Sequence, residues 1–254
     1  MFNLYEEIAL AQRENKKAVL LIVISTMGSS PQKPGAKMLV FEDGSTKGTI
    51  GGGVVEKEMI EKAKQFIHTG GCQKFTFNLE GDLAMACGGD MEIYMETLLP
   101  VPRLYIFGAG HVGKALAMFA KNTGFSIHLI DPRENIFNER DTEQYTCYNT
   151  DYFKVIENIP FDQNSYIVIV TPKHQYDEEL LGILAKKTYR YIGMIGSTRK
   201  VAIMKQRFME ENILTPDEIE KVDMPIGIKI AAQSPEEIAI SIVAKLIDVK
   251  NKAI

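Results

Sequence analysis

Three glycines with nucleotide-binding spacing lie near the middle of the chain, in the run Gly108-Ala109-Gly110-His111-Val112-Gly113. The run follows an apolar strand predicted over 103–107 and opens a helix predicted over 111–122. Asp131 ends the next predicted strand, 18 residues after Gly113. In this arrangement the glycines let backbone N–H groups approach a pyrophosphate, and the acid accepts hydrogen bonds from ribose hydroxyls. We therefore predict an NAD(P)-type site built from Gly108, Gly110, Gly113 and Asp131.

Arg133 lies two residues after Asp131, and because of it the sequence does not decide between NAD and NADP. Its guanidinium could pair with the 2′-phosphate of NADP, whereas Asp131 favours the ribose of NAD. A strand-ending turn without a ligand is the alternative for Arg133. The glycine turn itself could serve helix packing in a domain that binds no nucleotide.

Two histidines are candidates for proton transfer near neutral pH. His111 lies inside the glycine run, at the mouth of the predicted nucleotide site. His174 follows another predicted strand, 166–171, at the carboxyl edge where open α/β sheets bind ligands. A surface or hydrogen-bonded loop position is the alternative for each of them.

The segment Ile195-Gly196-Ser197-Thr198-Arg199-Lys200 repeats the passage from a strand to a helix. Small residues with exposed N–H groups, followed by two cations, predict a second anion site at Gly196 and Ser197. An ordinary helix cap with a solvated basic turn is the alternative.

The first hundred residues carry a second glycine-rich set. Gly51, Gly52 and Gly53 precede a helix predicted over 54–67, and glycines in this place bring backbone N–H groups close to a neighbour. Cys87 lies in Ala86-Cys87-Gly88-Gly89, where flexible backbone and a nearby helix end or cation could make the thiol reactive. Cys87 is a candidate handle for sulfur or for a metal cofactor, and a buried inert cysteine is the alternative.

These candidate residues lie in two parts of the chain that differ in the predicted order of strands and helices. Residues 1–99 predict a smaller α+β domain, in which Glu42-Asp43-Gly44 marks a hairpin. Its expected elements are a helix over 3–17, strands over 18–24, 37–41 and 45–50, the helix over 54–67, and strands over 74–77 and 91–98. Two prolines in Leu99-Pro100-Val101-Pro102 then interrupt strand pairing.

Residues 103–254 alternate strands and helices, as a parallel sheet with crossover helices requires. Further strands are predicted over 126–131, 166–171 and 189–195, and further helices over 177–187, 197–211 and 235–250. The fold class is therefore α/β, a C-terminal Rossmann-like domain joined to the smaller N-terminal α+β domain.

Composition narrows the function classes. A net charge of −4 with scattered Lys and Arg argues against a nucleic-acid or membrane-surface partner. The start carries no secretory signal pattern and no apolar run is long enough to span a membrane, so we expect a cytoplasmic protein. Three widely spaced cysteines suit a reducing compartment, and they predict no metal site.

Taken together, several ordered motifs resemble the XdhC/CoxI family of xanthine dehydrogenase accessory proteins along nearly the whole chain. In the first domain these are Gly28-Ser29-Ser30-Pro31-Gln32-Lys33-Pro34-Gly35-Ala36-Lys37-Met38, Gly48-Thr49-Ile50-Gly51-Gly52-Gly53-Val54-Val55-Glu56 and Cys87-Gly88-Gly89. In the second they are Gly108-Ala109-Gly110-His111-Val112, Tyr191-Ile192-Gly193-Met194-Ile195-Gly196-Ser197, Pro225-Ile226-Gly227 and Ser234-Pro235-Glu236-Glu237-Ile238-Ala239. CoxI-like members carry a cysteine where this chain has Val54.

The resemblance implies a chaperone-like accessory protein that binds molybdenum cofactor (molybdopterin) and promotes its sulfuration or insertion. Implied partners are a molybdenum hydroxylase such as xanthine dehydrogenase and a sulfur-donating desulfurase, and a homodimer is expected. The glycine loops with Lys33 and Lys37 would hold the pterin phosphate or dithiolene, and Cys87 would meet molybdenum or carry sulfur. An NAD(P)-dependent oxidoreductase using His111 or His174, and a binding module without turnover, stay open as alternatives.

Overall fold

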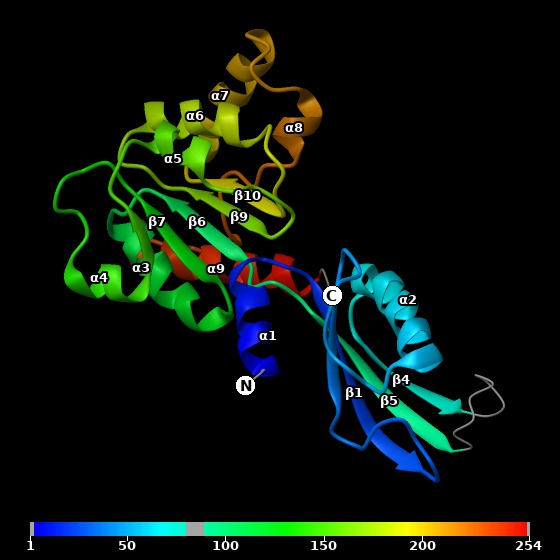
Figure 1. Ribbon diagram of the computed structural model, residues 1–254. Helices are drawn as coiled ribbons and strands as arrows, with labels where there is room; N and C mark the ends of the chain where they lie inside the picture. The colour runs from blue at the N-terminus through cyan, green and yellow to red at the C-terminus, as the bar shows by residue number, and fades with distance from the viewer. Residues whose placement is uncertain (1–2, 80–88, 253–254) are drawn as a thin grey trace. The chain divides into compact units, whose positions relative to one another are not determined.

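The computed structural model describes residues 3–79 and 89–252 (Figure 1). Two compact units divide the chain, residues 1–101 and residues 102–253, which we call the first unit and the second unit. The boundary falls between Val101 and Pro102. Because proline has no backbone N–H, Pro100 and Pro102 cannot donate to a continued strand ladder at this point.

The first unit is an antiparallel sheet in the order β3-β2-β1-β5-β4. Alternate residues of β5 are buried, and the buried residues of α2 recur about every fourth position. These are the strand and helix periods that the sequence predicts, so the α+β prediction is confirmed. The elements are α1 (Leu4–Arg13), β1 (Ala18–Met27), β2 (Lys37–Phe41), β3 (Thr46–Gly48), α2 (Gly53–Thr69), β4 (Cys72–Asn78) and β5 (Asp90–Leu98).

The second unit is a parallel sheet in the order β10-β9-β6-β7-β8. Counted along the chain from β8, this is the 3-2-1-4-5 order of a Rossmann-type sheet. The strands are β6 (Arg103–Phe107), β7 (Ser126–Ile130), β8 (Thr146–Tyr148), β9 (Ser165–Ile169) and β10 (Tyr191–Met194). The helices are α3 (His111–Ala120), the 3-10 turn η1 (Lys121–Thr123), α4 (Glu139–Gln144), α5 (Tyr152–Asn158), α6 (His174–Leu184), α7 (Thr198–Glu210), α8 (Pro216–Glu220) and α9 (Pro235–Asn251).

Helices cover both faces of this sheet (Figure 1). Tyr105 and Phe107 of β6 pack into a core with α5, α6 and α7, whereas Leu104 and Ile106 pack into a core with α3 and α9. Successive side chains of a strand point to opposite faces, so a strand buried on both sides must be apolar at every position. The predicted Rossmann-like α/β domain is confirmed.

Three predicted helix boundaries are wrong by three residues or more, and several short elements lie outside the predictions. α1 ends at Arg13 instead of residue 17, and Asn15 beyond it adopts a positive φ of 59°. α6 begins at His174, three residues before the predicted start, and ends at Leu184, three residues before the predicted end. His174 is therefore a helical residue. The short elements β8, α4, α5 and α8 contain too few residues to show a clear hydrophobic period.

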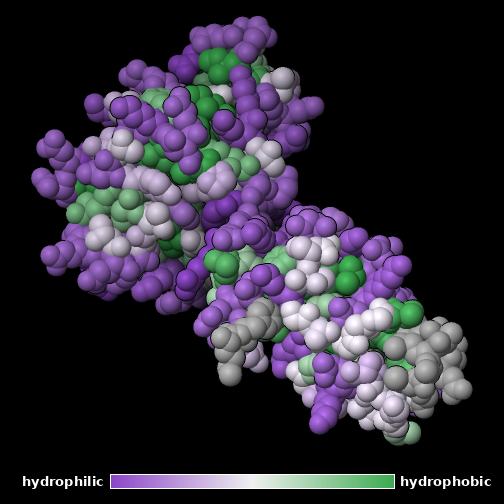
Figure 2. All heavy atoms as spheres, viewed as in Figure 1, coloured by the Kyte–Doolittle hydropathy of each residue, from purple (hydrophilic) through white to green (hydrophobic). Residues whose placement is uncertain are grey.

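The faces of both units that Figure 2 shows are mainly hydrophilic. Hydrophobic side chains lie among the hydrophilic ones in small patches. Most large apolar side chains of the described residues are buried in the cores. Among the helices of residues 3–79 and 89–252, none combines the length and the apolar character needed to cross a bilayer.

Candidate functional site

A pocket of about 520 Å³ lies at the carboxyl ends of the strands of the second unit. The segment after β6 contributes residues 109–112, and the segment after β7 contributes Arg133. The segments after β9 and β10 contribute residues 170–172 and Ile195. In open α/β sheets ligands bind at this edge where the strand order reverses, which is between β6 and β9 here.

The glycines of the loop after β6 serve two different purposes. Gly108 has a φ of 110°, and a Cβ there would lie 2.4 Å from the carbonyl oxygen of Val170. A Cβ on Gly113 would lie 1.9 Å from the carbonyl oxygen of Gly108. At Gly110, where φ is −74°, the one described atom within 4 Å of a Cβ is Nη2 of Arg133, at 3.7 Å. Packing therefore requires Gly108 and Gly113, whereas Gly110 leaves the backbone open toward the pocket.

The carboxylate of Asp131 is fully buried, and both of its oxygens accept hydrogen bonds from groups of the protein itself. Its Oδ2 accepts hydrogen bonds from the N–H of Ala109 (2.8 Å) and from Nη2 of Arg133 (2.7 Å). Its Oδ1 accepts from the backbone N–H (3.0 Å) and Nε (2.9 Å) of Arg133. Because a carboxylate offers about four lone-pair sites, a ribose hydroxyl would have to displace one of these donors.

Arg133 is held over the glycine loop by this bidentate pair. Its side chain keeps 43% of its surface exposed, and it lines the pocket beside Gly110. The N-terminus of α3 adds positive potential and free N–H groups at the same place. This wall of the pocket is therefore suited to a phosphate group.

Acid is expected to weaken the second unit through Asp131. Burial raises the pKa of Asp131, but hydrogen bonds from Arg133 and from Ala109 N–H outweigh burial, so the pKa lies below its ordinary value of about 4. A lowered carboxyl pKa stabilises the fold above about pH 4, and that stabilisation disappears as the pH falls through the folded-state pKa. We expect Asp131→Asn to lose less stability than the wild type between about pH 7 and about pH 3.

Urea unfolding followed by circular dichroism at both pH values measures this difference. Asp217→Asn, an exposed change in α8, serves as the control and should keep the wild-type dependence. An unchanged pH dependence in Asp131→Asn would contradict the assigned role of the pair.

Lys114 is a residue of this site that sequence reasoning missed. Its ammonium donates to the carbonyl of Ile136 (2.6 Å) and to Asp141 (2.7 Å), and it lines the pocket. A cation in the first turn of a helix opposes the helix dipole, so a partner was to be expected. Lys114 thus ties α3 to the segment that follows β7.

His174 lies between two charged groups, and its carboxylate partner was also missed. Its Nε2 lies 2.7 Å from Nζ of Lys200, and its Nδ1 lies 3.5 Å from Oδ2 of Asp177. The other oxygen of Asp177 accepts from the backbone N–H (2.9 Å) and the hydroxyl (2.7 Å) of Thr171. Thr171 lines the pocket, so the cluster adjoins the pocket wall.

The remaining predicted residues of the second unit lie on the same edge of the sheet. His111 is exposed at the first position of α3 and lines the pocket. Ser197 caps α7, and its hydroxyl accepts from the N–H of Lys200 (3.3 Å). Gly196 lies between Ser197 and Ile195 of the pocket wall. The capping role of Ser197 accounts for this residue without a ligand.

Glycine-rich segments of the first unit lie against each other. A Cβ on Gly89 would lie 2.4 Å from the carbonyl oxygens of Met27 and Ser29. A Cβ on Gly51 would lie 2.8 Å from Cγ of Pro31. The segment that follows β1 therefore contacts both the glycines before α2 and the glycine before β5.

The backbone N–H groups before α2 already donate to a carboxylate of the protein itself, that of Glu56. The carboxylate of Glu56 accepts hydrogen bonds from Thr49 Oγ1 (2.6 Å), Ile50 N–H (3.2 Å) and Gly52 N–H (2.9 Å). Gly51, Gly52 and Gly53 all have positive φ, from 63° to 129°. Glu56 thus holds this turn, and a phosphate at Gly52 would compete with it.

Lys37 and Cys87 are two further predicted site residues of the first unit. Lys37 begins β2, and its ammonium donates to the carbonyl of Gly35 (3.0 Å). Cys87 lies outside the described residues. Of the described cysteines, Cys72 is exposed, and partial burial raises the pKa of the Cys147 thiol. Among residues 3–79 and 89–252, no group of three or more His, Cys, Asp or Glu could hold a metal ion.

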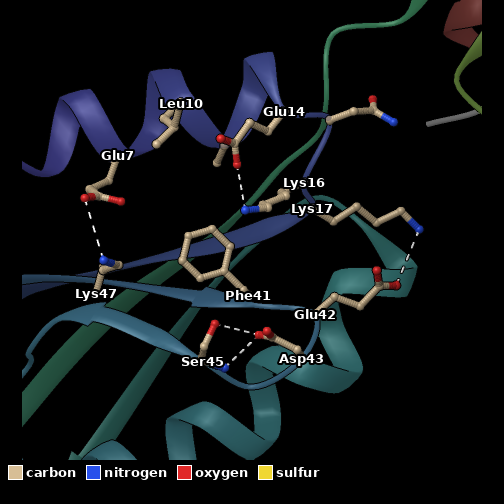
Figure 3. Close-up of a pocket in the computed structure, with 12 residues that line it drawn as sticks. Glu7, Leu10, Glu14, Lys16, Lys17, Phe41, Glu42, Asp43, Ser45 and Lys47 are labelled. Carbon is tan, nitrogen blue, oxygen red and sulfur yellow. Dashed lines mark hydrogen bonds and ion pairs between the residues drawn. The ribbon is translucent and has the colours of Figure 1, made fainter. Parts of the chain in front are cut away.

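A second hollow, of about 680 Å³, lies in the first unit between α1 and the β2–β3 hairpin (Figure 3). Glu7 of α1 and Lys47 of β3 point toward one another at 3.8 Å, both to one side of the Phe41 ring in this view. Lys16 pairs with Glu14 at 2.6 Å. Because Lys16 and Lys47 already have carboxylate partners, an anionic ligand would have to displace those carboxylates. We therefore favour the pocket of the second unit as the ligand site.

Comparison with known proteins agrees with this architecture. The XdhC Rossmann domain matches residues 104–246, and the description "XdhC and CoxI family" matches residues 11–78. The parallel sheet and its carboxyl-edge pocket thus belong to a Rossmann-type domain of this class. The chain is a member of the XdhC and CoxI family.

Three curated relatives cover different shares of the chain. "Uncharacterized protein YqeB" of Escherichia coli (strain K12) is 32% identical over 99% of this chain and 47% of its own length. A Bacillus subtilis (strain 168) protein, described as a probable xanthine dehydrogenase subunit, is 28% identical over 63% of this chain and 46% of its own length. "Molybdenum cofactor insertion chaperone PaoD" of Escherichia coli (strain K12) is 21% identical over 94% of this chain and 86% of its own length. The chain therefore spans about half the length of the first two.

A solved structure supports the fold. A crystal structure described as a xanthine dehydrogenase from Bacillus halodurans superposes with a TM-score of 0.55. The alignment covers 99% of this chain and 96% of the other, at 23% identity. At this identity the likeness supports the architecture alone.

Proposed function

We propose that this chain is an accessory protein in the maturation of a molybdenum hydroxylase of the xanthine dehydrogenase type. The observation that carries the proposal is the family match in both units. Two relatives carry names that point the same way, a molybdenum cofactor insertion chaperone and a probable component of xanthine dehydrogenase. In this proposal the chain acts as a homodimer, binds molybdenum cofactor as cargo, and promotes its sulfuration with a desulfurase or its insertion.

The first unit is the proposed cargo site. Glu56 already accepts the N–H of Gly52, so anionic groups of the cargo would be held by Lys33 and Lys37. Lys33 belongs to the segment between β1 and β2 that also contacts Gly51 and Gly89, and Lys37 begins β2 directly after this segment. Cys87, two residues before Gly89, is the proposed contact for sulfur or molybdenum.

The pocket of the second unit is the proposed nucleotide site. Asp131 has no free acceptor for a ribose hydroxyl, because Ala109 and Arg133 donate to both of its oxygens. Arg133 instead offers a partly exposed guanidinium beside Gly110. These residues fit a phosphate-bearing nucleotide of the NADP type better than NAD. The nucleotide would set the conformation of the accessory protein or supply redox chemistry to it.

An NAD(P)-dependent oxidoreductase with a small substrate is the second candidate. The observation that favours it is the buried carboxylate of Asp177 beside His174, a pairing found where histidines exchange protons. Steady hydride transfer by the purified chain without a partner would support the oxidoreductase over the accessory protein.

Restored activity of an immature molybdenum enzyme tests the maturation role. The purified chain is added with molybdenum cofactor to the apoenzyme from the same host, and hydroxylase activity is followed. Increased activation relative to cofactor alone supports the proposal. Equal activation with and without the chain would contradict it. Where the wild-type chain increases activation, the same assay with Cys87→Ser shows whether this thiol takes part.

Nucleotide preference is a separate expected result. We expect NADP to bind at least about tenfold more tightly than NAD, because a charge-assisted bond to the 2′-phosphate contributes roughly 1.5–3 kcal/mol. Isothermal titration of the full chain with each nucleotide measures both dissociation constants. Equal affinities, or tighter binding of NAD, would contradict the role given to Arg133.

A further inference from the structure

The described side chains that line the pocket of the second unit give it a positive charge. None of them is acidic, whereas Arg133 and Lys114 are cations and His111 becomes one when it is protonated. Arg133 is the proposed partner of the 2′-phosphate, which NADP carries and NAD lacks. The pyrophosphate, which both nucleotides carry, has no side chain assigned to it so far. Lys114 is the other described lysine or arginine of this wall.

Lys114 is placed where its side chain can reach a group bound at the glycine loop. It follows Gly110 by four residues, and its backbone N–H donates to the carbonyl oxygen of Gly110 (2.9 Å). Residues four apart lie on one face of a helix, and helical side chains lean toward the N-terminus of the helix. The side chain of Lys114 therefore leans back toward the turn that contains Gly110.

The ammonium of Lys114 is held by the protein but is not fully used. An ammonium has three N–H donors, and two of them go to the carbonyl oxygen of Ile136 (2.6 Å) and to Oδ2 of Asp141 (2.7 Å). The third donor has no acceptor among the described residues. The side chain of Lys114 keeps 34% of its surface exposed, so a ligand in the pocket can contact it.

The stability of α3 and α4 does not account for a cation at this position. A positive charge in the first turn of α3 opposes the helix dipole. The N-terminus of α4 is capped without the lysine, because the N–H of Asn138 donates to Asp141 (3.1 Å) and the N–H of Asp141 donates to the side chain of Asn138 (2.9 Å). An anion bound in the pocket would make the position of Lys114 favourable.

We propose that Lys114 binds the pyrophosphate of a dinucleotide in this pocket, and that Asp141 is a competing anion that weakens this contact. The inference rests on the proposed nucleotide site. In it Arg133 serves the 2′-phosphate, and the third donor of Lys114 serves the phosphate bridge that NAD and NADP share. The negative charge of Asp141, held by the same ammonium, opposes binding of the pyrophosphate.

Substitution of Lys114 separates the two phosphate contacts. We expect Lys114→Met to weaken NAD and NADP by the same factor, at least about tenfold, because a charge-assisted bond to the shared pyrophosphate is lost. Arg133→Met should weaken NADP more than NAD, because NAD has no 2′-phosphate. Isothermal titration of the full chain with each nucleotide measures the dissociation constants.

Lys121→Met is the matched control for the loss of a lysine between α3 and α4. Lys121 follows α3 in η1, and its ammonium donates to Oε1 of Gln144 in α4 (3.0 Å). It is not among the described residues that line the pocket. The change removes the same charge and a contact to α4, so both nucleotides should bind this variant as they bind the wild type.

Asp141→Asn distinguishes a ligand contact from a structural role of Lys114. The asparagine oxygen can still accept from the N–H of Asn138, so the cap of α4 is kept. Because the carboxylate charge is gone, both nucleotides should bind about threefold more tightly. If Lys114 acted only by holding α4 to α3, Asp141→Asn would weaken binding, as Lys114→Met does.

Three results would overturn the inference while leaving the nucleotide site in place. They are unchanged affinities in Lys114→Met, a loss of NADP affinity alone in that variant, and unchanged or weaker binding in Asp141→Asn. Should Lys114→Met fail to fold, Asp141→Asn still decides, because the ligand contact and the structural role predict opposite signs. Failure of the wild type to bind either nucleotide would overturn the proposed nucleotide site together with this inference.

Discussion

Gly113→Ala is expected to destabilise the second unit by roughly 3 kcal/mol or more, the largest effect on stability that we predict. The added methyl group would lie 1.9 Å from the carbonyl oxygen of Gly108 and 3.5 Å from Cγ2 of Ile106. A backbone carbonyl cannot rotate away as a side chain can. The loop and the first turn of α3 would therefore have to separate, at the cost of the packing between α3 and β6.

Urea unfolding followed by circular dichroism measures this loss, and an unfolded or insoluble variant would also agree with it. Gly110→Ala is the matched control in the same loop. Its methyl group would meet Nη2 of Arg133 at 3.7 Å, an ordinary contact, and its φ of −74° suits alanine. A Gly113→Ala protein as stable as Gly110→Ala would show that the loop can relax, and it would remove the packing argument.

Gly110→Ala is expected to have the opposite profile, with normal stability and nucleotide binding weakened by roughly 30-fold, about 2 kcal/mol. The methyl group would occupy the space through which the backbone approaches a phosphate. It would also stand beside the guanidinium of Arg133, the proposed phosphate partner.

Titration with NADP measures the affinity, and the unfolding curve of the same preparation shows whether the fold is intact. Gly182→Ala in α6, remote from the glycine loop in sequence, should bind NADP as the wild type does. Wild-type affinity in Gly110→Ala would favour the alternative in which the glycine turn serves packing alone. Together the two variants separate the packing role of the loop from its binding role.

The long helices and strands could be predicted from the sequence because their apolar residues recur in the pattern that burial of the element requires. Four buried residues of α2 recur every fourth position, and the apolar run of β6 indicates a strand buried on both faces. The three residues of β8 and the five of α8 are too short to show such a period. The start of α6 was misplaced because no capping side chain marks it: its N-cap is Lys173, and no side-chain cap bond is formed.

The grouping of the site residues was predictable to the extent that topology follows from strand order. Loops after neighbouring parallel strands meet at one edge, so Gly110, His111 and Arg133 could be expected together. The approach of His174 to Lys200, 26 residues apart, requires β9 and β10 to lie side by side, and sequence spacing does not specify this. Asp177 was missed because an acid in the first turn of a helix ordinarily needs no explanation beyond the helix dipole.

By itself the sequence determined the strand, the glycine turn and the helix of the nucleotide-like site, because only glycine fits a backbone that passes so close to carbonyl oxygens. Only the tertiary structure decided what each residue of that turn does. Gly108 and Gly113 pack, Gly110 stays open, and the acid expected to bind ribose is occupied by Ala109 and Arg133. The physical reason is that the partners of a buried carboxylate are whichever donors the fold brings within reach, and one of them is only two residues away.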